Sequence, residues 1–388
     1  MSGPLKGLKV LDLSRQLAGP FCTMTLGDLG AEVIKIEVPG RGDDSRYWGP
    51  FWNGESTYYM SVNRNKRSLE LDIKSEEGRK TFLELVKESD VLIHNLRVGK
   101  MERMGYGYED LKAIRPELIY CSISGYGSKG PLSDKVGLDL ALQAFSGLME
   151  ITGYPGSPPT RVGISIADLA TSMFALTGIL AALHYRNLTG QGQKVEVSLM
   201  ESLAAFMNYH AVGYFATGKL PEKEGSGLSR MVPYKAYRTK DGFIVIGIGN
   251  DETYARFCRL MGDERLAQDA YKTNQGRVEH ADELNPVIEE LLLARTTQEW
   301  VDLLLPGGVP CSPAFNIDYS LNHPQMKAME MVVDVPHPKV PDLKLMGIPM
   351  KFSETPGTIR RHPPLLGEHN EEILAELKAQ AGKTSVQS

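Results

Sequence analysis

One acidic residue, Asp168, lies within an otherwise uncharged and largely apolar stretch, ISIADLATSMFALTGIL (164–180). From Leu169 onward apolar residues recur at intervals of four and three, which predicts a core-facing helix that ends before Gly190. An aspartate just ahead of a helix can cap the free amide hydrogens of its first turn. The same amides can keep a carboxylate ionised and aimed, so that it acts as a covalent nucleophile. This segment by itself leaves both roles open.

Basic residues gather in two segments, SVNRNKRSLELDIK (61–74) and HNLRVGKMERMG (94–105). The first is equally well explained as a solvated charged face. The second begins where a predicted strand ends, and ligands of open parallel sheets bind beyond the carboxyl ends of the strands. Cations at that edge suit the phosphates of a bound carrier. The two segments contain Lys66, Lys74, Asn95, Arg97 and Arg103.

A third segment, residues 125–147, is rich in glycine and then becomes helical, with Asp139 at the start of the helical part. The eight histidines are scattered without an HExxH pattern, and the four cysteines form no CxxC pair. GxSxG and P-loop motifs are also absent from the sequence. These patterns favour neither a metal site nor a serine hydrolase nor a P-loop enzyme.

Composition places the chain among ordinary water-soluble enzymes. It has 388 residues, of which 42% are hydrophobic and 23% charged, and this length favours two domains. The formal net charge of -5 argues against nucleic acid as the main partner. Neither a signal peptide nor an apolar run of membrane-spanning length is recognisable. We expect a cytoplasmic protein that binds no membrane.

Short β-rich runs alternate with helical patterns through the first half, which predicts an α/β fold with a mostly parallel sheet. The first βαβ unit ends its second strand with an acid, Glu37, but lacks the GxGxxG fingerprint of nicotinamide-binding folds. We therefore expect a Rossmann-like domain without a nicotinamide site. The predicted strands are 9–13, 32–37, 90–95, 118–123 and 194–199, and a charged surface helix is predicted over 76–88.

The second half predicts a smaller α+β domain. VPYKAYRTKDGFIVIGIGN (232–250) reads as two strands joined by a KDG turn, followed by helical stretches near 251–262 and 281–305. We expect the large domain over residues 1–221, the small domain over 222–325, and a return segment over 326–388 that completes the large domain and contains a helix near 370–378.

The order of these segments resembles the family III CoA-transferases over nearly the whole chain. Within that family, GDDSRYWGPF (42–51), VPYKAYRTKDG (232–242) and YKTNQGRVEH (271–280) are most similar to the succinate–hydroxymethylglutarate type, which acts on dicarboxylates. The resemblance depends on LDLSRQLAGP (11–20), LGDLGAEVIKIE (26–37), GDDSR (42–46), NRNKRSLELD (63–72), NLRVGKMERMGYGYEDL (95–111), SISGYGSKGP (122–131), ADLATS (167–172), TGQGQKVEVSL (189–199) and PPLLGEHNEE (363–372).

The resemblance implies an interlocked homodimer and a role for each matching residue. It makes Asp168 the nucleophile and Asp139 an orienting acid. Coenzyme A would lie along Gln16, Leu71, Lys74, Asn95 and Arg103, and we add Lys66 and Arg97 on grounds of charge. Formyl-CoA transferase carries cationic or aromatic residues where this chain has Val38, Val136 and Leu138, so the adenine and phosphate contacts are expected to differ.

The implied reaction moves coenzyme A from an acyl-CoA donor to a free carboxylic acid through an aspartyl mixed anhydride and an aspartyl thioester. No tightly bound cofactor or metal is expected. A dicarboxylate would need a cation for its remote carboxylate, for which Arg15 is the first candidate and Arg230 the second. Gly225 and Gly227 are candidates for a loop that shields the anhydride from water.

Three alternatives stay open. A 2-methylacyl-CoA racemase of the same fold would need a second acid/base, which in that enzyme is a histidine at the position of Leu138. A nicotinamide oxidoreductase is disfavoured by the missing glycine fingerprint. A non-catalytic CoA-binding protein remains open if Asp168 is inert.

Overall fold

The computed structural model describes residues 3–386, with side chains up to residue 380. The chain divides into two compact units, which we describe separately. Unit 1 combines the segments up to Leu148, from Arg161 to Val212 and from Pro324 onward. Unit 2 combines Met149–Thr160 with Gly213–His323. Unit 1 is thus made from both ends of the chain, and most of unit 2 lies between these ends in the sequence.

The borders between the units differ from the predicted ones. Unit 2 begins at Gly213 and ends at His323, whereas 222 and 325 were predicted, and it also includes residues 149–160, which we had placed in the large domain. The backbone amide of Gly225 donates to the Gly153 carbonyl at 2.9 Å, and Lys223 Nζ donates to the Pro158 carbonyl at 2.6 Å. These bonds, between residues far apart in sequence, tie the 149–160 segment to unit 2.

A six-stranded parallel sheet forms the centre of unit 1, in the order β5-β2-β1-β6-β7-β8. Five of its strands lie where the sequence predicts strands. The sixth, β5, lies in the first basic segment. Its residues Lys66, Arg67 and Ser68 are polar, so it lacks the apolar run that is typical of a buried strand. The strands are β1 (Lys9–Asp12), β2 (Glu32–Glu37), β5 (Lys66–Glu70), β6 (Val91–His94), β7 (Ile119–Ser124) and β8 (Lys194–Ser198).

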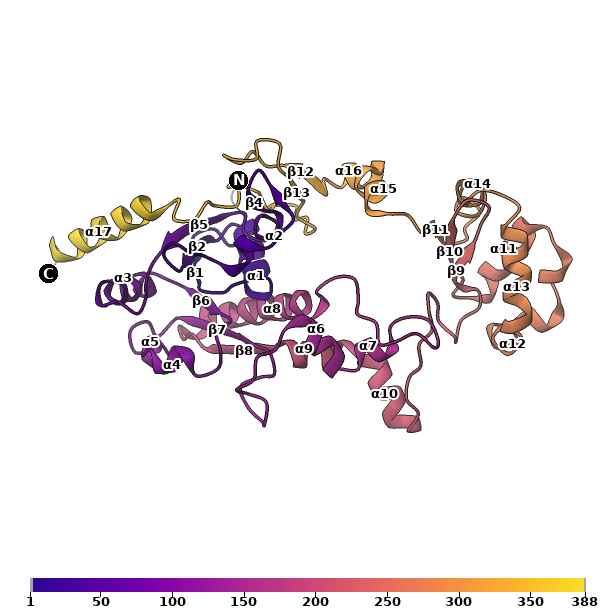
Figure 1. Ribbon diagram of the computed structural model, residues 1–388, viewed down its shortest axis with the longest axis horizontal. Coiled ribbons are helices and arrows are strands. Elements are labelled where there is room, and N and C mark those ends of the chain that lie inside the picture. Colours follow the sequence, from indigo (N-terminus) through magenta and orange to yellow (C-terminus); the bar gives the residue numbers. More distant parts are fainter. Residues whose placement is uncertain (1–2, 387–388) are drawn as a thin grey trace. The chain divides into compact units, whose positions relative to one another are not determined.

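Alternating side chains of the sheet feed two cores, because successive residues of a strand point to opposite faces. On one face Val10 packs with residues of α1 and α8, and on the other Leu11 packs with residues of α3. Figure 1 shows α3 on one side of these strands and α1 and α8 on the other. Long helices of unit 1 are α1 (Ala18–Asp28), α3 (Glu76–Lys87), α8 (Ile166–Thr189) and α9 (Leu199–Phe206).

The other elements of unit 1 lie in the connections between sheet and helices and in the return segment. They are β3 (Phe51–Trp52), β4 (Glu55–Ser56), α2 (Thr57–Ser61), α4 (Lys100–Arg103), α5 (Tyr108–Lys112), α6 (Asp139–Phe145), α16 (Pro324–Ala328), β12 (Val332–Asp334), β13 (Lys344–Met346) and α17 (Asn370–Val386). The helix α10 (Asn208–Thr217) crosses the border between the units.

The return segment binds unit 1 by contacts distant in sequence. The Arg360 side chain donates to the carbonyls of Gly27 and Ala31, at 2.9 and 3.0 Å, and the His369 amide donates to the Ser68 carbonyl at 3.1 Å. Ile373 of α17 is buried with the α3 face of the sheet. The chain therefore completes the large unit with its carboxyl-terminal part.

Unit 2 is built on a three-stranded antiparallel sheet, in the order β11-β10-β9. The predicted hairpin is present, and the helical stretch predicted over 281–305 is two helices, because Thr296 and Glu299 form a capping box that starts a new one. The elements are α7 (Leu148–Ile151), β9 (Tyr234–Arg238), β10 (Phe243–Gly247), α11 (Asp251–Met261), α12 (Asn274–Glu279), α13 (Ala281–Leu292), α14 (Thr297–Leu304), β11 (Cys311–Pro313) and α15 (Ile317–Asn322).

Helix α8 has the length and mean hydropathy (1.8) of a membrane span, and half of its most apolar window is buried inside the protein. The core helix of a water-soluble protein passes the same test. Its buried side chains, among them Ala175, Ile179 and Leu183, belong to the core that covers one face of the sheet. The apolar character of α8 is thus accounted for in part by packing in unit 1.

Candidate active site

Asp168 is the third residue of α8, which begins at Ile166 and not at Leu169 as predicted. Asp168 therefore is not the cap ahead of the helix. Ser165 occupies that position without a side-chain capping bond, and the Asp139 carboxylate instead accepts the Ala167 amide at 2.8 Å. An acid 28 residues upstream in the chain satisfies this end of the helix. Asp168 is consequently left available for another role.

Burial, and after it the neighbouring charge of Asp139, together raise the pKa of Asp168 to about 7. A carboxyl group of this kind is costly to ionise where it stands, because it is partly removed from water and its charged neighbour is another acid. Strongly perturbed acids of this type concentrate at functional sites. When ionised, Asp168 is a poorly stabilised and therefore reactive carboxylate.

Tyr58 of α2 lies beside the start of α8. A hydrogen bond joins its hydroxyl to Ser165, and burial together with the charge of Asp168 raises the pKa of Tyr58 to about 12. The Tyr58 ring stands edge-on to Trp48, with centroids 5.2 Å apart. These two aromatic residues were not among the predicted site residues, and nothing in the local sequence distinguishes them from other aromatic residues.

The loop after β1 is tied to α8 and held in an uncommon conformation. Ser172, one turn beyond Asp168, donates to the Ala18 carbonyl at 2.6 Å. Gln16 has φ of 70°, a left-handed conformation that is strained for a side chain of this kind, and its amide donates to the Asp43 carboxylate at 3.1 Å. Such strain persists only where surrounding contacts impose it, and it is frequent at functional sites.

Asn95, at the end of β6, clamps the same loop from the other side. Its Oδ1 accepts the Arg15 amide at 2.9 Å and its Nδ2 donates to the Arg15 carbonyl at 2.7 Å. The sheet order changes direction between β1 and β6, and ligands of open α/β sheets bind at this switch point. The Asn95 carboxamide is therefore committed to the loop, and it shapes the binding edge of the sheet.

Five cations gather at this edge. Burial lowers the pKa of Lys100, and the positive charges of Arg15, Lys74, Arg97 and Arg103 lower it further. Arg15 lies 3.8 Å from Asp44, but within the part of the chain that the structure describes the other four form no ion pair. Cations that repel one another at close range predict an anionic ligand between them.

A cavity of about 140 Å³, lined by apolar side chains and also by the acids Glu37 and Asp72, adjoins this cationic cluster, which comprises Arg15, Lys74, Arg97, Lys100 and Arg103. Three of the cations, Arg15, Lys74 and Lys100, also line the cavity. Its apolar walls include Leu71, as the resemblance implies, and Val38. A cavity with apolar walls beside several cations suits a flat base with phosphates. The remaining apolar walls are Leu13, Ile36, Pro39, Ile73, Leu96 and Met104.

The structure brings together Arg15, Leu71, Lys74, Arg97 and Arg103, and it places Gln16 and Asn95 in the adjoining loops. Lys100 was present in the basic segment but was not chosen as a site residue. Its neighbours Arg97 and Arg103 stand three residues to either side, a helical spacing that could have identified it.

The prediction that Lys66 contacts coenzyme A is wrong. Lys66 is completely buried, and its Nζ lies 3.0 Å from an Asp12 oxygen and donates to Asn63 and to the Pro20 carbonyl. All three ammonium hydrogens are thus used inside the protein. A second buried pair, Lys35 with Asp43 at 2.8 Å, continues this network toward the Gln16 amide. Lys66 supports the binding edge from below.

Glu37, the acid that ends β2, is also fully engaged within the protein. Its carboxylate pairs with Arg46 at 2.6 and 2.8 Å and accepts the Ser68 hydroxyl at 2.7 Å. The corresponding acid of a nicotinamide-binding fold must be free to accept ribose hydroxyls. This geometry, together with the missing fingerprint, removes the basis for an oxidoreductase.

The candidate residues of the second half lie in unit 2. Gly225 has φ of 68°, and a Cβ there would stand 2.8 Å from the Tyr154 ring; a Cβ on Gly227 would stand 2.6 Å from the Tyr234 carbonyl oxygen. Both glycines are therefore required by packing within this unit. The Arg230 carbonyl accepts the Asn274 side chain at 2.9 Å.

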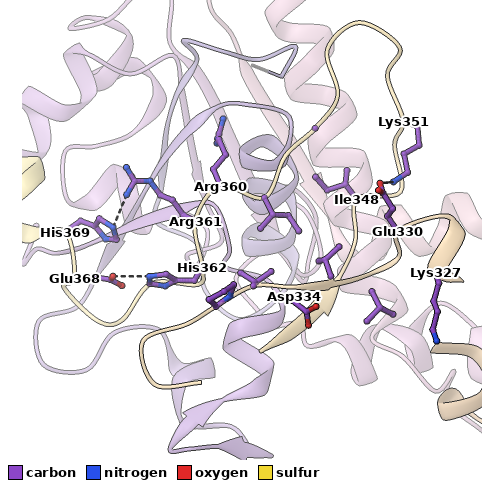
Figure 2. Close-up of a pocket in the computed structure, with 16 residues that line it drawn as sticks. Lys327, Glu330, Asp334, Ile348, Lys351, Arg360, Arg361, His362, Glu368 and His369 are labelled. Atoms are coloured by element: carbon purple, nitrogen blue, oxygen red, sulfur yellow. Dashed lines mark hydrogen bonds and ion pairs between the residues drawn. The ribbon is translucent and has the colours of Figure 1, made fainter. Parts of the chain in front are cut away.

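A broad cavity of about 950 Å³ in unit 1 lies against the return segment (Figure 2). Two pairs of its lining residues lie within ion-pair distance, Lys351 with Glu330 at 3.8 Å and His362 with Glu368 at 3.4 Å. Because none of the predicted site residues lines this cavity, it is not the candidate active site.

Comparison with known proteins gives matches over nearly the whole chain. The family model for CoA-transferase family III matches residues 5–370. A succinyl-CoA:glutarate CoA-transferase of Homo sapiens is 43% identical over 376 residues, covering 96% of this chain and 86% of that protein. An acetyl-CoA:oxalate CoA-transferase of Acetobacter aceti is 38% identical, covering 98% and 97%.

Among solved structures, a CAIB/BAIF family protein from Brucella suis superimposes with a TM-score of 0.88 at 36% identity. The superposition covers 97% of this chain and all of that one. The α/β architecture with its six-stranded parallel sheet is thus shared over the full length.

Proposed function

The chain belongs to CoA-transferase family III, and we propose that it exchanges coenzyme A between two dicarboxylic acids with Asp168 as the covalent nucleophile. The observation that carries the mechanism is the partly buried carboxyl at the start of α8, whose pKa is raised to about 7 by burial and by Asp139. A carboxylate poised near neutral pH attacks a thioester more readily than a fully solvated one.

The proposed reaction conserves the thioester without an added energy source. An Asp168 oxygen attacks the carbonyl carbon of the donor thioester, and the C–S bond breaks. Coenzyme A leaves as thiolate, and a mixed anhydride of Asp168 and the donor acid remains. The thiolate then attacks the aspartyl carbonyl and releases the donor acid. The acceptor carboxylate attacks the resulting aspartyl thioester, and the freed thiolate takes the acceptor acyl group from the second anhydride, regenerating Asp168.

Coenzyme A is held, in this proposal, at the edge of the sheet. The cationic cluster binds its phosphates, and the cavity between Val38 and Leu71 takes the adenine. Arg15 lines this cavity with Lys74 and Lys100, which favours a phosphate contact over the contact with a dicarboxylate that the sequence suggested. Arg230 of unit 2 then remains the candidate for the remote carboxylate, and Gly225 and Gly227 the candidates for the shielding loop.

A dicarboxylate acceptor is supported by the relatives, several of which are named for succinate, glutarate or oxalate. The racemase alternative needs a second base, and the residue that precedes Asp139 is Leu138, an exposed aliphatic side chain. A transferase needs only the single carboxylate. We therefore retain the transferase and expect no exchange of the α-hydrogen of a 2-methylacyl-CoA with deuterium.

We also infer a homodimer with interlocked chains. Large apolar side chains are exposed on α8 and α9, including Phe174 at 39% and Phe206 at 52%, whose ring centroids lie 5.9 Å apart. A second copy of the chain would remove this face from water. Phe206→Glu should convert the dimer to monomers, which light scattering would detect. A wild-type protein whose mass in solution equals that of one chain would contradict the inference.

The direct test of the mechanism is to trap the enzyme thioester. The protein is mixed with succinyl-CoA, quenched with borohydride, which reduces an aspartyl thioester to an alcohol, and digested for mass spectrometry. A mass loss confined to the Asp168 peptide, and absent in Asp168→Asn, is expected. An unmodified Asp168 peptide in a preparation that turns over acyl-CoA would refute covalent catalysis.

The substrate class is tested with matched acceptors of equal chain length. Initial rates with succinyl-CoA should favour glutarate over pentanoate, and Arg230→Ala should reduce this preference by about tenfold, as for loss of one charged contact. Arg15→Ala should leave the preference unchanged and raise KM for the acyl-CoA. Equal rates for the two acceptors would exclude a dicarboxylate-specific site.

A further inference from the structure

Gln143 is a buried side chain of α6 for which neither the sequence motifs nor the proposed mechanism provides a role. Its exposed fraction is 0%, and it lies one helical turn after Asp139 on the same helix. A buried carboxamide must satisfy two donors and an acceptor, so each of its partners matters for stability.

The partners of Gln143 are Asp139 on the same helix and two residues of the segment that precedes α8. Its Nε2 donates to the Asp139 carboxylate at 2.7 Å and to the Ile164 carbonyl at 3.4 Å. Its Oε1 accepts the Val162 amide at 2.9 Å. The carboxamide has one orientation that fits, because the two acceptors face its nitrogen and the donor faces its oxygen.

The Asp139 carboxylate connects Gln143 to the start of α8. One of its oxygens accepts from Gln143 and the other accepts the Ala167 amide, the residue directly before Asp168. Residues 162–164 form the segment that leads into α8, and Gln143 bonds both ends of that segment. Gln143 therefore joins the segment before the nucleophile to the acid beside it.

We propose that Gln143 is a positioning residue that holds Asp139 and the 162–164 segment in register, and so fixes the carboxylate of Asp168 for attack on the thioester. This inference depends on the proposed function, in which Asp168 is the nucleophile. Small displacements of an attacking group reduce rates strongly, since the reacting atoms must meet at close range and in the right direction.

Two substitutions distinguish the hydrogen bond of Gln143 to Asp139 from its hydrogen bond to the Val162 amide. Gln143→Glu keeps an oxygen for the Val162 amide but loses the obligatory donor to Asp139. Gln143→Met has a side chain of similar length and loses both hydrogen bonds. The matched control is Gln298→Met, since Gln298 also bonds an aspartate four residues away on its helix, at 2.7 Å, but on an exposed surface of unit 2.

We expect Gln143→Met to lower kcat by about 10- to 100-fold, with KM for the acyl-CoA within about threefold of the wild-type value. In Gln143→Glu the introduced carboxyl can donate to Asp139 only while it is protonated. Its activity should therefore be closest to wild type at low pH and fall as pH rises, opposite to the acid-side loss expected of the wild-type enzyme.

The pH profile gives a readout that a merely structural role would not change. In Asp139→Asn the neighbouring negative charge is removed, so the pKa of Asp168 falls and the acid limb of kcat/KM moves to lower pH. If Gln143 acts through Asp139, Gln143→Met should have a several-fold smaller effect on kcat in the Asp139→Asn background than in the wild type.

Each outcome decides between the inference and its premise. Wild-type kcat and pH profile for both Gln143 variants, with Asp168→Asn inactive, would refute the positioning role and leave the nucleophile in place. Activity in Asp168→Asn would refute the proposed function itself. Gln143→Glu keeps the Val162 bond, so it tests the role even where Gln143→Met fails to fold.

Discussion

Unit 1 contains two groups of buried or partly buried acids that differ in their partners. Below the binding edge, Asp12 lies 3.0 Å from Lys66 and Asp43 lies 2.8 Å from Lys35. At the start of α8, the charged neighbour that acts on Asp168 is a second acid. Burial alone would raise the pKa of Asp12 and Asp43, but the lysines and hydrogen-bond donors together outweigh it and hold both below their ordinary values.

The difference shows how similar burial serves two purposes. A buried acid with a cation and hydrogen-bond donors fixes the backbone around it, as Asp43 fixes the strained Gln16. A partly buried acid without a cation is held at a free-energy cost, and that cost makes its carboxylate reactive. In the proposed mechanism, the paired network supports the site and the unpaired acid is the nucleophile.

The contrast between paired and unpaired acids is tested most directly by removing the unpaired acid. Asp168→Asn should lower kcat for CoA transfer from succinyl-CoA by at least about 10³-fold, because no covalent intermediate can form. Turnover is measured by the appearance of the acceptor thioester, with the exposed Asp134→Asn as control. A loss of less than tenfold would mean that Asp168 is not the nucleophile.

Removing a partner from the paired network should affect stability instead. Lys66→Met leaves Asp12 without its nearest cation in the protein interior and should cost about 3–5 kcal/mol of unfolding free energy. Urea unfolding measures the change. The matched control is Lys344→Met, whose exposed pair with Asp334 at 2.9 Å should be worth less than about 1 kcal/mol. Equal effects of the two changes would contradict the assignment.

The unfolding free energy of Asp168→Asn tests whether the unpaired acid is held at a free-energy cost. The folded-state pKa of Asp168, about 7, exceeds its ordinary value of 3.8, so its protonated form stabilises the fold and this stabilisation is lost as pH rises through about 7. Asparagine cannot ionise. Asp168→Asn should therefore raise the unfolding free energy at pH 8, by up to about 4 kcal/mol at 1.36 kcal/mol per pH unit.

This gain should shrink at pH 5 and vanish below pH 4, which denaturation at the three pH values would show. A favourable acid at a helix start predicts the reverse, since its removal would cost about 0.3–1 kcal/mol at neutral pH. The sign of the change thus separates a nucleophile held at a cost from an acid that serves the helix.

The same contrast extends to the cations, with the smallest expected effect. Lys66 is paired and buried, whereas Lys100 stands among four other cations. Lys100→Ala should raise KM for the acyl-CoA by about tenfold with kcat unchanged, and added salt should reduce the difference. Lys80→Ala, on the exposed face of α3, is the control. An unchanged KM would remove Lys100 from the phosphate site.

Much of the frame could be predicted from local sequence. Alternating or continuous apolar runs located five of the six strands of the parallel sheet, and the periodic stripe located α8 to within three residues of its start. Asp168 and the basic segment 94–105 stood out because residue type and position along the chain are local properties. The family resemblance supplied the reaction.

The sequence by itself thus determined the order of the elements and which residues carry charge. Only the tertiary structure decided what each charge does. Lys66 and Lys100 look alike in the sequence, yet the first is buried with Asp12 as its ion-pair partner and the second lies among four other cations. Asp139 caps α8 across 28 residues, and Asn95 clamps Arg15 across 80. The physical reason is that the cost of a charge depends on its burial and its partners, and both are set by contacts between segments far apart in the chain.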